Sequence, residues 1–90
     1  MTRIFKYQLP IRDEFELELP KGAKVLSVIN QYEQTCLYAE VDSGTTERDT
    51  YKFIGYGTGN ECYHDDSYSF LGTVAFDGGS FIYHLFYKKL

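Results

Sequence analysis

The last third of the chain restricts the fold most, because it reads as two strands joined by a tight turn. Tyr68–Tyr87, YSFLGTVAFDGGSFIYHLFY, has apolar runs on both sides of Asp77-Gly78-Gly79. Glycine supplies the positive φ that two-residue hairpin turns require, so either Asp77-Gly78 or Gly78-Gly79 can form the turn. The sequence therefore predicts a C-terminal β-hairpin as the central element of the fold.

Both faces of this predicted hairpin are apolar. In either turn register, even-numbered residues of the first strand share a face with odd-numbered residues of the second. One face carries Phe70, Gly72, Val74, Phe76, Phe81, Tyr83, Leu85 and Tyr87, and the other carries Leu71, Thr73, Ala75, Ile82, His84 and Phe86. A surface hairpin alternates apolar and polar residues, so we expect each face to be covered by another sheet, a barrel interior or a partner subunit. Gly72 leaves room for a facing aromatic ring to lie across the strand.

The composition agrees with an all-β chain. Nine Tyr and seven Phe among 90 residues favour strands, because aromatic side chains pack well on a pleated surface and lose rotamer freedom in a helix. No window keeps apolar residues at the spacing of an amphipathic helix. We expect one all-β domain over residues 1–90, folded as an antiparallel sandwich or partly open barrel of six to seven strands.

Further strands are expected before the hairpin. The alternation is cleanest in EFELEL, where apolar side chains face one side and glutamates the other. The apolar content of 23–30 favours a central place in a sheet, and residues 30–34 fit a hairpin loop. The expected strands are 3–9, 14–19, 23–30, 35–41 and 51–56. Residues 42–50 and the region that starts at Gly57 and runs to the hairpin are polar and read as loops.

Charge and composition exclude several classes of protein. The net charge is −4, and no run of Lys or Arg could neutralise several phosphates in a row, so binding to nucleic acid is disfavoured. The N-terminal sequence lacks a secretion signal, and no apolar run is long enough for a membrane helix. We expect a cytoplasmic protein away from membranes, with Cys36 and Cys62 reduced.

The motifs IFKYQLP, LPKGAKVLSV, YGTG, LGTV and HLF occur in this order across nearly the whole chain. In this order and spacing the chain resembles a family of short, functionally uncharacterised proteins of bacteriophage and prophage genomes. The resemblance implies a phage accessory protein that acts in the host cytoplasm, and it implies no catalytic residue. Members of this family usually have a proline in the segment that corresponds to residues 60–69, and this chain has none. The resemblance therefore implies no common role for this loop.

One loop holds the densest group of metal-ligating or acid-base side chains: Cys62, His64, Asp65 and Asp66. A structural zinc site needs four ligands, and a second Cys/His pair is absent, so we interpret the group as a polar loop without metal. Gly57-Thr58-Gly59 lacks the spacing of a dinucleotide fingerprint. With no hydrolase or metalloprotease motif, we expect no enzyme and no cofactor; a small metal-dependent or acid-base enzyme that uses His64 and Asp66 is the third hypothesis.

The remaining candidates for binding are aromatic and polar residues near the hairpin. His84 lies in mid-strand near Thr73, so it is either a half-buried imidazole held by a hydroxyl or a ligand contact. The excess of tyrosine suits an interface with a second copy or a partner. The residues predicted to bind a ligand or partner are Tyr56, Thr58, Tyr63, His64, Tyr83, His84, Tyr87 and Arg48. The basic residues available to an anion are Arg3, Arg12, Lys21, Lys24, Arg48 and Lys52.

Together these observations favour a non-enzymatic phage accessory protein that acts by binding. Counter-defence is the leading hypothesis, either by inhibiting a host defence protein or by sequestering a small nucleotide signal. Self-association into a homo-oligomer is expected: a protein that sequesters a signal should form an oligomer with a ligand pocket, whereas a protein inhibitor needs only one exposed patch. The alternative is a structural or assembly component of a phage or of an oligomeric scaffold, in which the tyrosines are subunit contacts and no ligand exists.

Overall fold

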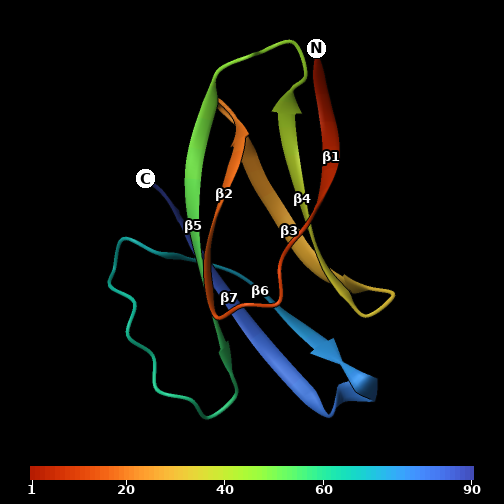
Figure 1. Cartoon of the computed structure of the whole chain (residues 1–90), viewed down its shortest axis with the longest axis vertical. Coiled ribbons are helices and arrows are strands. Elements are labelled where there is room, and N and C mark those ends of the chain that lie inside the picture. The colour runs from red at the N-terminus through yellow and green to blue at the C-terminus, as the bar shows by residue number, and fades with distance from the viewer.

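The computed structural model describes residues 1–90 and consists of two antiparallel sheets (Figure 1). The three-stranded sheet has the order β1-β4-β3, with β1 (Thr2–Gln8), β4 (Gln34–Asp42) and β3 (Lys24–Gln31). The four-stranded sheet has the order β2-β5-β7-β6, with β2 (Glu14–Pro20), β5 (Arg48–Gly57), β7 (Phe81–Lys89) and β6 (Ser69–Phe76). The predicted all-β fold of seven strands is confirmed, as a sandwich whose sheets do not close into a barrel. No helix of the length and apolarity needed to cross a membrane is present.

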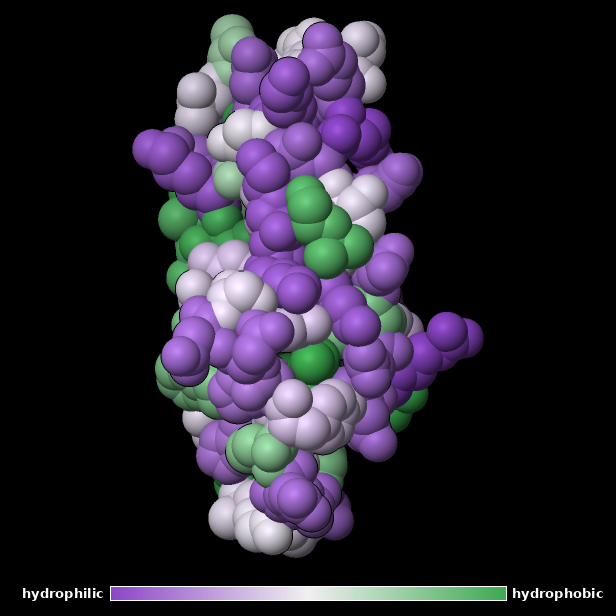
Figure 2. Space-filling view, turned by 90° about the vertical axis from the view of Figure 1, so that its left-hand side faces the viewer, coloured by the Kyte–Doolittle hydropathy of each residue, from purple (hydrophilic) through white to green (hydrophobic).

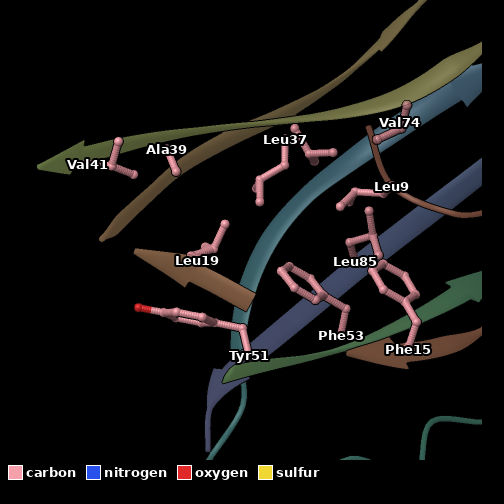
Figure 3. Close-up of a cluster of buried hydrophobic side chains, with 11 residues drawn as sticks. Leu9, Phe15, Leu19, Leu37, Ala39, Val41, Tyr51, Phe53, Val74 and Leu85 are labelled. Atoms are coloured by element: carbon pink, nitrogen blue, oxygen red, sulfur yellow. The ribbon is translucent and has the colours of Figure 1, made fainter. Parts of the chain in front are cut away.

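The hydrophobic core lies between the two sheets (Figure 3). Leu37, Ala39 and Val41 of β4 point toward Phe53 of β5 and Leu85 of β7, and all five side chains are buried. Burying a side chain the size of Leu or Phe contributes about 1.5–3 kcal/mol. The alternation in β2 follows from this core, because its apolar side chains face inward and its glutamates face outward.

The C-terminal hairpin is present, but its turn is wider than predicted. Phe76 pairs with Phe81, which is the register centred on Gly78-Gly79. Asp77–Ser80 form a four-residue loop that contains the short 3₁₀ turn η1 (Asp77–Gly79), in which Asp77, Gly78 and Gly79 have φ of 50°, 64° and 96°. The Ser80 N–H and hydroxyl both donate to Asp77, at 3.2 and 2.9 Å, and these bonds stabilise the wider loop.

A β-bulge changes the predicted faces of the hairpin at its far end. The register shifts between Phe70 and Gly72, so that Phe70 pairs with Phe86 instead of lying on the face of Tyr87. Leu71 consequently packs against the core, whereas Phe70 points outward and is 57% exposed. The prediction for these two residues was wrong, because a bulge adds one residue and reverses the alternation beyond it.

The space beside Gly72 is filled by an aliphatic side chain, not by the predicted aromatic ring. A Cβ atom on Gly72 would lie 2.9 Å from Val28 Cγ1 of the facing sheet. The ring that lies across a glycine is that of Tyr83, which covers Gly55 so closely that a Cβ there would be 2.0 Å from the ring.

β3 lies at an edge of its sheet, contrary to the predicted central place. Its apolar residues are explained by the facing sheet, because Val28 packs against β6 and the Asn30 side chain donates a 2.8 Å hydrogen bond to Ala75 O. The predicted hairpin loop at 30–34 is confirmed, with Tyr32 and Glu33 as the turn residues between β3 and β4. The predicted loop at 42–50 is shorter, because β5 already begins at Arg48.

The inner face of the four-stranded sheet is covered, as expected, but the outer face is covered only in part and by the chain itself, because Thr73 and Ala75 of β6 stay exposed there. The inner face meets the three-stranded sheet, and the outer face meets the loop 58–68 that connects β5 to β6. Ile54 and Tyr56 of β5 are 2% and 5% exposed, yet they stand outside the main core. A second, smaller apolar layer therefore lies beneath the loop.

Candidate functional site

The loop 58–68 is fixed to the sheet by one phenol group. The Tyr56 hydroxyl oxygen accepts the backbone N–H groups of Tyr63 and His64, each at 3.1 Å. His64 Nδ1 lies 3.1 Å from the same oxygen, so the phenol proton can be donated to the imidazole. A buried hydroxyl thus holds two consecutive main-chain donors and a side chain of the loop.

Aromatic rings fill the space beneath the loop. The His64 ring stacks on Phe86 of β7 at a centroid distance of 4.1 Å, and Phe86 also meets the edges of Tyr56 and Phe70. Tyr63 packs edge-on against Tyr56 at 5.4 Å. Such ring pairs contribute about 0.5–1.5 kcal/mol beyond the area that they bury, so the cluster holds the loop in one position.

Charged residues of β2 and β5 bind the Tyr63 side of this aromatic cluster. The Tyr63 hydroxyl donates to Glu14 of β2 at 3.2 Å, and Lys52 of β5 forms an ion pair with the same carboxylate at 2.6 Å. The Lys52 hydrogen bond, followed by that of Tyr63, lowers the pKa of Glu14. Burial, followed by the bond to Glu14, raises the pKa of the Tyr63 phenol.

His84 is held by a hydroxyl on each side of its ring. Thr73, its cross-strand partner on β6, lies 3.0 Å from Nδ1, and Thr58 lies 2.8 Å from Nε2. The half-buried imidazole held by a hydroxyl is therefore confirmed for Thr73. Thr58 is the additional partner, and it ties the start of the loop to the centre of the sheet.

A hollow of about 220 Å³ opens between the start of the loop and the outer face of the sheet. Its aromatic walls are Tyr56, Phe70 and Phe86, and its polar groups are Thr58, His84 and the exposed amide of Asn60. The side of the molecule that carries β5 and the loop is mostly hydrophilic, with apolar atoms in small separate patches (Figure 2). We refer to this hollow as the outer pocket.

The structure brings together five of the eight predicted binding residues. Tyr56, Thr58 and His84 line the outer pocket, and Tyr63 and His64 belong to the loop that covers the adjoining rings.

The other three lie elsewhere. Tyr83 faces inward and lines a separate hollow of about 290 Å³ beside Arg12 and Phe81, where its hydroxyl donates to Arg12 O at 2.7 Å. Tyr87 faces inward at the opposite end and lines a hollow of about 370 Å³ with Lys24, Lys88 and Lys89. Arg48 is exposed at the start of β5.

The acidic and thiol groups of the loop do not gather around one point. Cys62 is exposed, His64 is engaged with Tyr56, and Asp65 accepts the backbone N–H of Ser67 at 2.8 Å. The Ser67 hydroxyl, followed by that N–H, lowers the pKa of Asp65. No three His, Cys, Asp or Glu side chains of the protein lie close enough to share a metal ion.

One family model, described as "Domain of unknown function (DUF7352)", matches residues 1–90. The chain belongs to this family. No curated protein and no solved structure matches it.

Sequence reasoning missed three walls of the outer pocket in this DUF7352 chain: Asn60, Phe70 and Phe86. Phe86 was assigned to the correct face of the hairpin. Its packing partner could not be predicted, because the His64 ring contacts it from the loop 58–68. Phe70 was assigned to the wrong face because of the bulge. The one available indication was that both hairpin faces are apolar, which requires a cover on the outer side.

Proposed function

We propose that this chain is a non-enzymatic binding protein that holds a small planar ligand of the nucleobase class in the outer pocket. Within the phage context suggested by the sequence motifs, such a protein acts in the host cytoplasm and sequesters a nucleotide signal of host defence. The observation that carries the proposal is the combination of three aromatic walls with three polar groups in one hollow.

The chemistry of the pocket supports a nucleobase. Every base has a π-face, and stacking on an aromatic side chain contributes about 1–3 kcal/mol per base. Asparagine amides pair well with the adenine edge, and the Thr58 hydroxyl, which is bonded to His84, keeps an acceptor lone pair next to Asn60. The volume of about 220 Å³ is below the usual range for drug-sized ligands, so it suits one ring system with its sugar and phosphate outside.

A cation for the phosphate lies further along the same face. Lys88 follows Phe86 on the outer face of β7, and its Nζ lies 3.4 Å from Ser67 Oγ and 4.7 Å from the centre of the Tyr68 ring. Lys88 takes part in no ion pair within the protein, so it is free to meet an anion.

Calorimetric titration with a panel of adenine, guanine and pyrimidine nucleotides, including cyclic dinucleotides, tests the proposal. We expect at least one nucleotide to bind, and Phe70→Ala to weaken binding by roughly 5- to 150-fold, the equivalent of one lost stacking contact. Phe81→Ala is the matched control, because Phe81 is also half exposed but lies beside Tyr83 on the inner face. No binding by any nucleotide, or equal affinities for both variants, would count against the outer pocket.

Two alternative functions can be tested beside nucleotide binding: inhibition of a host protein and a structural role. A host-protein inhibitor needs one exposed patch, and a pull-down from infected cells would identify the protein. A structural component would form an open-ended assembly by light scattering. The exposed edge of β1 favours self-association.

A further inference from the structure

β1 is an edge strand whose outer row of backbone groups has no partner. Next to the strand, Ser43 N–H donates to Met1 O and Leu9 N–H donates to Thr35 O, both at 2.9 Å. In an antiparallel ladder this fixes the odd-numbered residues of β1 as those bonded to β4. The N–H and C=O groups of the even-numbered residues point away from the sheet: Thr2, Ile4, Lys6 and Gln8.

The other three edges of the two sheets carry features that discourage strand pairing. β2 presents Glu14, Glu16 and Glu18 along its edge and ends in Pro20. β3 and β6 each contain a bulge, and they are joined to each other through Val28 and the Asn30 side chain. β1 has no proline, no bulge and no acidic side chain, and its only charges are Arg3 and Lys6, which can each face an uncharged residue of an added strand. A straight edge with unpaired backbone groups is a template for another strand, provided that its charges do not meet like charges.

Apolar side chains accompany this free edge on both faces. Ile4 points outward and is 61% exposed, and Phe5 points toward the sandwich interior but is still 41% exposed. β1 lies outermost beside β4 in the upper right of Figure 1, with no element beyond it. A strand added at this position would cover both side chains.

We propose that β1 pairs with β1 of a second copy of the chain, antiparallel and about a twofold axis at Phe5. In this register Thr2 faces Gln8 and Ile4 faces Lys6 of the second copy, so every outward N–H and C=O from Thr2 to Gln8 finds a partner. The two three-stranded sheets become one continuous six-stranded sheet. The assembly is closed, because the same edge is used on both copies.

The side chains select this register. Arg3 faces Tyr7 and Lys6 faces Ile4 of the second copy, so no like charges stand opposite each other. The two Phe5 side chains meet at the axis in a non-hydrogen-bonded pair, where cross-strand side chains are closest. A register centred on Lys6 would place two lysines face to face, and one centred on Ile4 would leave Gln8 unpaired.

Light scattering and native mass spectrometry of the full chain, without any ligand, test the inference independently of the proposed nucleotide. We expect a dimer for the unmodified chain. Ile4→Lys places like charges opposite Lys6 at two symmetric positions and should raise the dissociation constant by about tenfold or more. Ile4→Glu, which is similar in size but opposite in charge, should keep the dimer and make it sensitive to salt. Thermal unfolding should show both variants folded, because Ile4 is exposed.

Oxidative cross-linking tests the position of the axis. In a Cys62→Ser background, Phe5→Cys should form a disulfide-linked dimer, because the residue faces its own copy. Arg3→Cys is the control and should not, because Arg3 faces Tyr7. A monomer at all concentrations would overturn the inference. So would a dimer that is unaffected by Ile4→Lys, or equal cross-linking through both cysteine variants.

Discussion

At the scale of single residues, tyrosine hydroxyls connect parts of the chain that are distant in sequence. Tyr83 of β7 lies across Gly55, and its hydroxyl donates to Arg12 O in the connection between β1 and β2. Burial, followed by the nearby Asp13 carboxylate, raises the pKa of Tyr83 to about 12. The neutral phenol is thus part of the folded structure, and its ionisation opposes folding.

This predicts a late step in the alkaline titration of the folded protein. Because the folded-state pKa is raised above the ordinary value of 10.0, the stabilisation is complete below about pH 10 and is lost as pH rises toward 12. Absorbance at 295 nm should show Tyr83 ionising after the exposed tyrosines, and Tyr83→Phe should remove that step. Simultaneous ionisation of all tyrosines near pH 10 with the fold intact would contradict this assignment.

At the scale of elements, the loop 58–68 and the β3–β4 hairpin show what local sequence can and cannot specify. The strands followed from period-2 alternation, and the hairpin between β3 and β4 followed from the polar residues at its tip. The bulge at Phe70 and Leu71 had no compositional mark, because one extra residue in a strand changes the register without changing the residue types. The edge position of β3 depends on strands far away in sequence.

The candidate site was predicted in the same partial way. Tyr56, Thr58 and His84 were predicted because they are polar or amphipathic residues within apolar strands or beside glycines. The anchoring of the loop could not be predicted, because the donors on Tyr56 are main-chain N–H groups that any residue provides. A sequence pattern identifies side chains, whereas these hydrogen bonds depend on where the main-chain N–H groups of the loop lie in the fold.

Tyr56→Phe should loosen the loop without removing the ring packing. Two N–H groups lose their acceptor, and an unsatisfied buried polar group costs about 1–3 kcal/mol, so urea unfolding should show a loss of stability in this range. Amide hydrogen exchange at Tyr63 and His64 should accelerate. Tyr63→Phe is the control, because it removes only a surface bond to Glu14 and should cost less than about 1 kcal/mol. Equal losses in both variants would argue against Tyr56 as the anchor.

The turn between β3 and β4 offers a stabilising substitution. Tyr32 and Glu33 have φ of 56° and 63°, the conformation of a type I′ turn, and Tyr32 is 92% exposed. Asparagine tolerates positive φ better than tyrosine, so Tyr32→Asn should raise the free energy of unfolding by up to about 1 kcal/mol. Tyr32→Phe has no such advantage and should leave the unfolding midpoint unchanged. A lower midpoint for Tyr32→Asn would show that the tyrosine ring stabilises the turn.

At the scale of the whole molecule, close approaches at two glycines fix the packing, one between the two sheets and one within the four-stranded sheet. Val28 of β3 fills the space at Gly72 of β6 and closes that side of the sandwich. The Tyr83 ring fills the space at Gly55, and its hydroxyl bond prevents the ring from moving aside. The opposite side, between β1 and β2, has no comparable contact, so the sandwich is closed along one side and open along the other.

Alanine at these glycines should therefore destabilise the fold in a graded way. Gly72→Ala forces a small displacement of Val28 and should cost about 1–3 kcal/mol by chemical denaturation. Gly55→Ala meets the Tyr83 ring at 2.0 Å and should cost more, with loss of soluble protein as the extreme result. Gly44→Ala, where the nearest atom is 3.5 Å away, should stay within about 0.5 kcal/mol. Equal effects at Gly44 and Gly55 would contradict the close packing.

Tyr56 holds the loop 58–68 through main-chain N–H groups, so the attachment of the loop does not depend on the loop's exposed side chains. Because the phenol oxygen binds the N–H groups of residues 63 and 64, the exposed side chains of Glu61, Cys62 and Asp66 take no part in the anchor. These positions can be randomised in a library while the loop keeps its place on the sheet. Such variants would keep the seven strands and differ only at the rim of the outer pocket. The molecule could therefore serve as a small scaffold for selecting new ligand specificities.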